Sequence, residues 1–124
     1  MKALLSALAL VFSALQAFAV PTPAPIRAEI DALMGKLVAS GCQFDRNGSL
    51  HSGEEAKGHI LRKLEYLEGK RTLQSTEQFI ELAASQSSSS GKPYFVKCGS
   101  APAVPSQQWL QGQLQALRAK PKGQ

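Results

Sequence analysis

The chain has 124 residues, of which 44% are hydrophobic and 19% are charged. This size allows one small domain and excludes a multidomain enzyme or a polytopic membrane protein. Aromatic residues make up only 6%, with a single Trp, which argues against a surface that stacks nucleic-acid bases.

The first nineteen residues have the three parts of a secretory signal peptide. Lys2 gives the positive start, residues 3–15 form an apolar run, and Ala17 and Ala19 are small residues at the positions that a signal peptidase reads. The alternative is an uncleaved anchor, but the stretch is at the short limit for crossing a bilayer. We therefore predict cleavage after Ala19, a periplasmic or secreted protein, and no stable membrane insertion afterwards.

A Pro-rich lead at residues 20–24 precedes the first predicted helix. Pro25 suits the first turn of a helix, and Gly41 suits a left-handed helix end. The apolar residues between them recur at helical spacing: Ile26, Ile30, Leu33 and Leu37.

Capping boxes mark the start of two further helices. Ser52 precedes Glu55 by three residues, and Ser75 precedes Gln78 by three, the spacing at which a serine side chain caps the backbone. A last helix, which we predict Ser106 to cap, carries Trp109, Leu110, Leu114 and Leu117.

Two segments with alternating side chains predict short strands. Residues 42–46 place Cys42 and Phe44 on one face and end at an Asn-Gly turn signal that begins at Asn47. Residues 93–98 alternate in the same way. The spacing leaves open whether the two strands are parallel or antiparallel.

Cys42 and Cys98 are the only cysteines, one in each strand segment. An even count in an exported chain indicates a disulfide, and no C-x-x-C spacing supports a metal or redox pair. A bridge closing a loop of about 57 residues would stabilise the fold by roughly 4 kcal/mol. We therefore predict one structural disulfide.

These features predict a single α+β domain over residues 25–118. Three to four amphipathic helices pack on a short two-stranded sheet, and the disulfide ties the two strands. Because two strands alone are marginal, helix packing and the bridge must stabilise them. Residues 119–124 form a polar tail.

Several short motifs follow one another along the chain: C-x-F-x-R-N-G at residues 42–48, A-x-x-H at 56–59, S-x-E-x-F-I at 75–80, S-x-x-x-G-x-P-Y at 87–94 and the second cysteine at 98. This pattern resembles a family of small exported bacterial proteins that is catalogued only as a domain of unknown function. The resemblance covers about residues 26–117. It implies bacterial origin and export, and it brings no catalytic residues with it.

The polar residues of this region form a hypothetical binding site: Arg46, Asn47, His59, Lys63, Ser87, Ser90 and Tyr94. The serine-rich loop beside the tyrosine suits a polar ligand, provided that its serines face inward. The alternative is a loop without a ligand that only closes the last strand.

Arg46 lies on the core face of its strand, where its guanidinium can hold a carboxylate in a fork. We favour an internal acceptor, for example Glu55 or Glu77, over an external anion. His59 lies at the edge of an apolar helical stripe. We favour a boundary histidine bonded to a backbone carbonyl over an acid–base group, although its ordinary pKa suits such a role.

His51, Glu55 and His59 are spaced by four residues and would share one helix face, as metal ligands can. The helix start at Ser52 leaves His51 outside the regular turns, so we predict no metal and no cofactor.

Basic residues gather in the middle of the chain, and the formal net charge is +5. Glutamates interleave with them, which favours a solvated surface of mixed charge. No nucleic-acid motif is present, so we predict no nucleic-acid partner.

The leading hypothesis is a non-enzymatic binding or accessory module of the bacterial envelope, monomeric, with an envelope ligand or protein as its partner. One alternative is a small hydrolase or transferase in which His59 activates Ser87 or Ser90, which requires a hydrogen bond between them. Another is a protein inhibitor that presents the serine loop as a rigid protrusion. We lean against enzyme activity because no G-x-S-x-G elbow is present.

Overall fold

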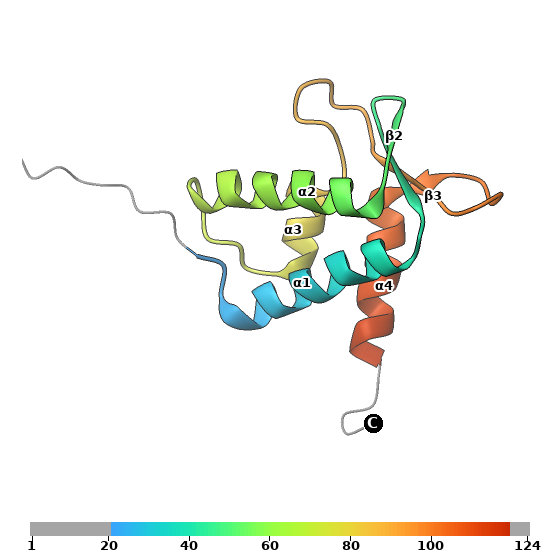
Figure 1. Ribbon diagram of the computed structural model, residues 1–124. Helices are drawn as coiled ribbons and strands as arrows, with labels where there is room; N and C mark the ends of the chain where they lie inside the picture. Colours follow the sequence, from blue (N-terminus) through green and yellow to red (C-terminus); the bar gives the residue numbers. More distant parts are fainter. Residues whose placement is uncertain (1–20, 120–124) are drawn as a thin grey trace, which may run out of the picture.

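The computed structural model describes residues 21–119, so the predicted signal peptide and residues 120–124 of the tail lie outside the described residues. The elements, in chain order, are α1 (Ala24–Ala39), β1 (Gln43–Arg46), β2 (Ser49–His51), α2 (Gly53–Glu68), α3 (Thr76–Ala83), β3 (Phe95–Lys97), β4 (Val104–Pro105) and α4 (Ser106–Ala119). In Figure 1, α1 and α2 lie side by side, and α3 and α4 pack behind them. No helix within the described range combines the length and apolar character needed to cross a membrane.

The serine cap of each predicted capping box is confirmed, but the reciprocal bond to the backbone N–H of the serine is not formed. Gln78 Oε1 accepts instead from the backbone N–H of Gln74, and Glu55 Oε1 accepts from the Ser52 hydroxyl. The Ser52 side chain accepts a hydrogen bond from the backbone N–H of Glu55 at the start of α2, and Ser75 does the same for Gln78 at the start of α3. Each cap satisfies one of the backbone donors that the first turn of a helix leaves unpaired.

The predicted cap at Ser106 is wrong. Helix α4 begins at Ser106 itself, and the buried Ser106 hydroxyl donates to the carbonyl oxygen of Ala84 at 2.5 Å. The hydroxyl therefore ties α4 to the end of α3 and does not cap its own helix.

The predicted α+β class is confirmed, and the sheet has four strands in the order β2-β1-β3-β4, all antiparallel. The two predicted strands, β1 and β3, form its centre. Asn47 and Gly48 both have positive φ, +53° and +84°, which gives the two-residue hairpin turn that returns β1 into β2. The edge strands β2 and β4 were not predicted because they are only three and two residues long.

The predicted disulfide is present. Cys42 and Cys98 lie directly beyond the paired residues Gln43 and Lys97, with their Cα atoms 4.3 Å apart. The bridge therefore closes one end of the β1–β3 ladder.

The core forms between the helices and one face of the sheet. The rings of Phe44 on β1 and Tyr94 beside β3 are both buried, with centroids 5.0 Å apart. Both rings belong to one buried core cluster with apolar residues from each helix, among them Leu33, Leu37, Ile60, Leu64, Phe79, Ile80, Leu110 and Leu114.

Two polar contacts fix the outer ends of the helices. Thr22, in the Pro-rich lead, donates to the Glu68 carboxylate at the end of α2 from both its backbone N–H and its hydroxyl. Arg118 on α4 bonds to Glu29 on α1 and to Glu77 on α3.

Gly53, the first residue of α2, packs against the backbone of α1. A Cβ atom there would lie 2.9 Å from the carbonyl oxygen of Leu37 and 3.0 Å from the Cα of Val38. We expect Gly53→Ala to lower the free energy of unfolding by about 1–3 kcal/mol, because backbone must move to admit the methyl group.

Gly112→Ala is the matched control, because no atom lies within 4 Å of that position in α4. It should raise stability by about 0.5–1 kcal/mol, the usual gain of alanine over glycine in a helix. Urea denaturation measures both variants. A Gly53→Ala protein as stable as the wild type would contradict the close packing of α1 on α2.

Candidate functional site

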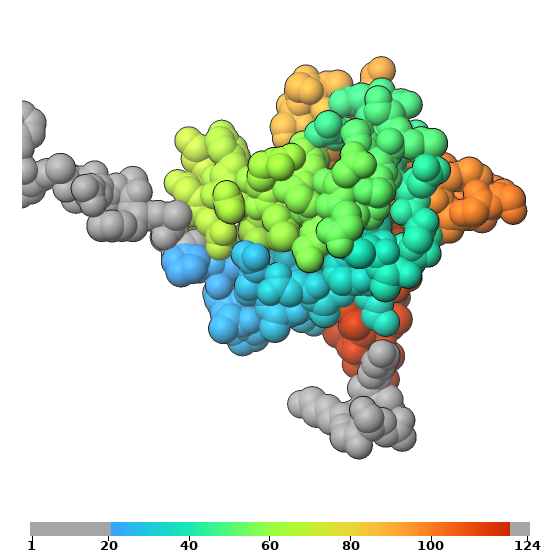
Figure 2. Space-filling model, viewed as in Figure 1, coloured from blue at the N-terminus to red at the C-terminus, as the bar shows by residue number. Residues whose placement is uncertain are grey.

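Six of the seven predicted site residues line one open cleft of about 640 Å³. The cleft, called here the Arg46 cleft, lies between α2, the β1–β2 turn and residues 87–90, called here the serine loop. Figure 2 shows the loop and the hairpin rising beside each other at one side of the molecule. The lining residues are Arg46, Asn47, Ser49, His51, His59, Lys63, Ser87, Ser88, Ser89 and Tyr94.

Strand register brings Arg46 and Tyr94 together. Phe44 on β1 pairs with Val96 on β3. In the same antiparallel register, Arg46, two residues after Phe44, lies opposite Tyr94, two residues before Val96. Both side chains are then on the face that carries Phe44. The helix α2 crosses this face, and its residues His59 and Lys63, one turn apart, both reach the Tyr94 hydroxyl.

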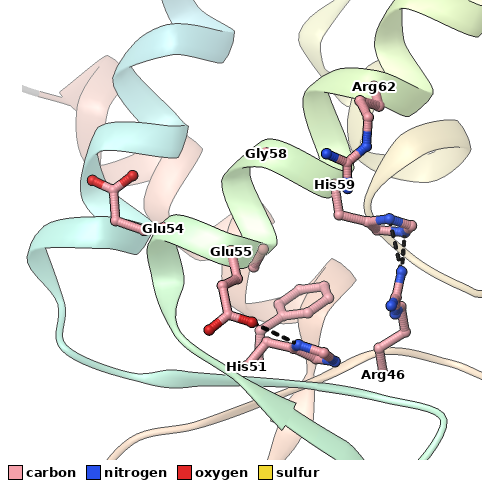
Figure 3. A pocket seen from close by; sticks show the side chains of 9 residues that line it. Arg46, His51, Glu54, Glu55, Gly58, His59 and Arg62 are labelled. Atoms are coloured by element: carbon pink, nitrogen blue, oxygen red, sulfur yellow. Dashed lines mark hydrogen bonds and ion pairs between the residues drawn. The ribbon is translucent and has the colours of Figure 1, made fainter.

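The central contact of the cleft joins Arg46 to His59. The guanidinium Nη1 lies 2.8 Å from Nδ1 of the ring and 3.2 Å from Nε2, as Figure 3 shows. A guanidinium can only donate, so one ring nitrogen accepts, and we assign this role to the nearer one, Nδ1. In this neutral tautomer Nε2 carries the proton and donates to the Tyr94 hydroxyl oxygen, which lies 3.2 Å away. The predicted bond from His59 to a backbone carbonyl is therefore wrong.

The predicted internal carboxylate for Arg46 is also wrong. Glu55 bonds instead to Nδ1 of His51 at 3.1 Å, and Glu77 pairs with Arg118 at 2.6 Å. Both acids have nearer basic partners in the fold, which leaves Arg46 against a neutral ring.

Positive charge dominates the cleft. Burial, followed by the charges of Arg46 and Lys63, lowers the pKa of His59 from 6.5 to about 4. Burial and the Arg46 charge also lower the pKa of Lys63. Burial raises the pKa of the Tyr94 hydroxyl. No carboxylate contributes to any of these shifts.

Lys63 and Tyr94 are connected at the floor of the cleft. The Lys63 ammonium donates to the carbonyl oxygen of Gln86 at 2.9 Å and to the Tyr94 hydroxyl at 3.4 Å. Because His59 and Lys63 use both lone pairs of that hydroxyl, its own proton is left to donate to a third group.

The serine loop is fastened to the hairpin by Asn47. The Asn47 side-chain amide donates to Ser87 Oγ at 3.3 Å, and Ser90 Oγ donates to the Asn47 carbonyl oxygen at 2.7 Å. Ser87 is 4% exposed, as an inward-facing residue should be. Ser90 is exposed and does not line the cleft, so its predicted inward orientation is wrong.

The bond that a His–Ser nucleophile pair requires is not formed within residues 21–119. His59 bonds to Arg46 and Tyr94, whereas Ser87 and Ser90 bond to Asn47. A histidine with a pKa of about 4 is also a weak base at neutral pH.

The spacing of His51, Glu55 and His59 does not give a metal site. Arg46 lies against both ring nitrogens of His59, and its positive charge opposes a cation there. In the described part of the chain, no three His, Cys, Asp or Glu residues are arranged to hold an ion.

A smaller hollow of about 310 Å³ lies beyond the Arg46–His59 contact, lined also by His51, Glu55 and Arg62. Figure 3 shows Arg62 on the turn of α2 that follows His59. Arg62 was not among the predicted site residues, although its three-residue spacing from His59 puts both on one helix face.

Ser49, Ser88 and Ser89 were also missed as lining residues. Ser49 could have been found, because a two-residue Asn-Gly turn pairs it with Arg46 across the hairpin.

A family model described as a family of unknown function (DUF5329) matches residues 24–118. The chain belongs to this family. A relative, "Uncharacterized protein YfeK" of Salmonella typhimurium, is 40% identical over 68 residues, which are 54% of this chain and 55% of the relative. The chain thus spans about half the length of the relative it matches. No solved structure matches the chain.

The low pKa of His59 predicts that the protein loses stability in mild acid. Between pH 6.5 and about 4, the unfolded state binds a proton at this residue and the folded state does not. The free energy of unfolding should therefore fall as the pH is lowered through this window. NMR titration of the His59 ring protons should give a midpoint near 4. A midpoint near 6.5 would show that the ring is not buried against Arg46.

Proposed function

We propose that the protein is a non-enzymatic binding module of the bacterial envelope, and that its Arg46 cleft holds the anionic group of a polar ligand. The observation that carries the proposal is that Arg46 and Lys63, both partly buried, form no ion pair with any of the residues from 21 to 119.

A partly buried cation without a counter-ion is costly. Arg46 has five N–H donors, and its contact with His59 uses one nitrogen. The planar fork of a guanidinium matches a carboxylate or a phosphate. An anion from outside would therefore complete a site that the chain itself leaves open.

Other donors surround the same space. The Tyr94 proton is free to donate, and Lys63 retains one N–H beyond its two hydrogen bonds. The exposed serines Ser88 and Ser89 also line the cleft. Several donors around one cleft suit an oxyanion that carries several lone pairs.

The disulfide and the predicted signal peptide support a location outside the cytoplasm, where disulfides persist. The inhibitor alternative receives less support, because Asn47 ties the serine loop to the wall of the cleft. The ligand is accordingly expected among molecules of the envelope.

The test is a calorimetric titration of the purified, oxidised protein with inorganic phosphate and with acetate. We expect Arg46→Gln to weaken binding of the preferred anion by about 10- to 100-fold, the value of a charged hydrogen bond. Arg71→Gln is the matched control, because Arg71 is exposed and lies outside the cleft. It should bind as the wild type does.

A thermal melt of each variant verifies that the fold is intact. The proposed function would be contradicted if the wild type bound neither phosphate nor acetate, or if Arg46→Gln bound the preferred anion as tightly as the wild type does.

A further inference from the structure

We propose that the ligand carries a short apolar chain or a single ring next to its anionic group, so that the site takes a small amphiphilic acid. This inference rests on the proposed function of the Arg46 cleft. It comes from a second groove, lined by His59, Arg62, Lys63, Tyr66, Leu67, Leu82 and Ser88.

The groove continues the Arg46 cleft. It has a volume of about 430 Å³ and shares His59, Lys63 and Ser88 with the cleft. The two hollows therefore adjoin along α2, and a ligand anchored at Arg46 lies next to the groove.

Charge and apolar surface alternate along this part of α2. Lys63 is followed one turn later by Leu67, and Arg62 by Tyr66. Residues four apart are neighbours on a helix surface, so each cation lies beside an apolar side chain. This order matches a molecule with an anionic head and an apolar substituent.

The apolar part of the groove is available to a ligand. Tyr66 is 67% exposed and, with Leu50, is one of two exposed large hydrophobic residues in the described chain. Lys70 lies 5.5 Å from the centre of the Tyr66 ring, which helps to hold the ring in place. Leu67 and Leu82 are partly buried and pack against the core.

The small number of apolar side chains limits the occupant. Tyr66, Leu67 and Leu82 can cover a short chain or one ring, but they offer little surface to a long acyl chain. The cations Arg62 and Lys63 at the border disfavour an uncharged apolar molecule, whose burial there would desolvate them. A small monomeric acid satisfies both conditions.

The experiment compares acetate with hexanoate, two carboxylates that differ only in the length of the chain. Each fully buried methylene is worth roughly fourfold in affinity. The groove is open and buries the chain only in part, so we expect hexanoate to bind the wild type roughly tenfold more tightly than acetate. Tyr66→Ser should reduce this preference to about twofold or less without changing the affinity for acetate.

Leu50→Ser is the matched control, since Leu50 is also exposed but lies on β2, outside the groove. It should leave both affinities unchanged. Equal binding of acetate and hexanoate by the wild type would overturn this inference and leave the proposed function standing. An equal loss of acetate and hexanoate binding in Tyr66→Ser would overturn the inference as well.

Two further outcomes concern the proposed function itself. Failure of both carboxylic acids to bind would overturn this inference alone if phosphate still binds. Failure of phosphate as well, or hexanoate binding that Arg46→Gln does not weaken, would overturn the anion site together with this inference. The protein could instead bind vesicles of anionic phospholipid and neither free acid. That result would make a membrane surface the occupant and would overturn the inference of a small acid.

Discussion

The Cys42–Cys98 bridge closes one end of a β1–β3 ladder that is only three residue pairs long. So short a ladder holds its register weakly, and a slip by one residue would turn every side chain to the opposite face. The bridge prevents that slip. It thereby keeps Arg46 and Tyr94 on the face that α2 crosses, and the cleft depends on this register.

The contact between Arg46 and His59 follows from the same arrangement. The ring is neutral because burial and the neighbouring cations oppose its protonation, so it accepts a hydrogen bond without cancelling the charge of the guanidinium. An acidic residue at that position would have satisfied Arg46 within the fold. The neutral histidine instead contacts Arg46 and leaves its charge without a counter-ion among residues 21–119, as the proposed anion site requires.

Much of the fold could be predicted from local signals, because the capping serines, the alternation in β1 and β3 and the two cysteines each have a local physical cause. The edge strands were too short to show a pattern. Most of the residues that line the Arg46 cleft could be named from the sequence, because their motifs lie on the paired strands, α2 and the serine loop. The partner of Arg46 could not be predicted, because it depends on the pairing of the acids in the folded chain. Glu55 pairs with His51, and Glu77 pairs with Arg118.

The most direct measurement of the central claim is an NMR map of backbone amide shifts during a titration of the oxidised protein with phosphate. We predict that the largest shifts cluster at the walls of one cleft: Arg46, Asn47, His59, Lys63, Ser88 and Ser89. Shifts centred on another basic region, such as Arg118 on α4, or spread evenly over the surface, would contradict an anion site at Arg46.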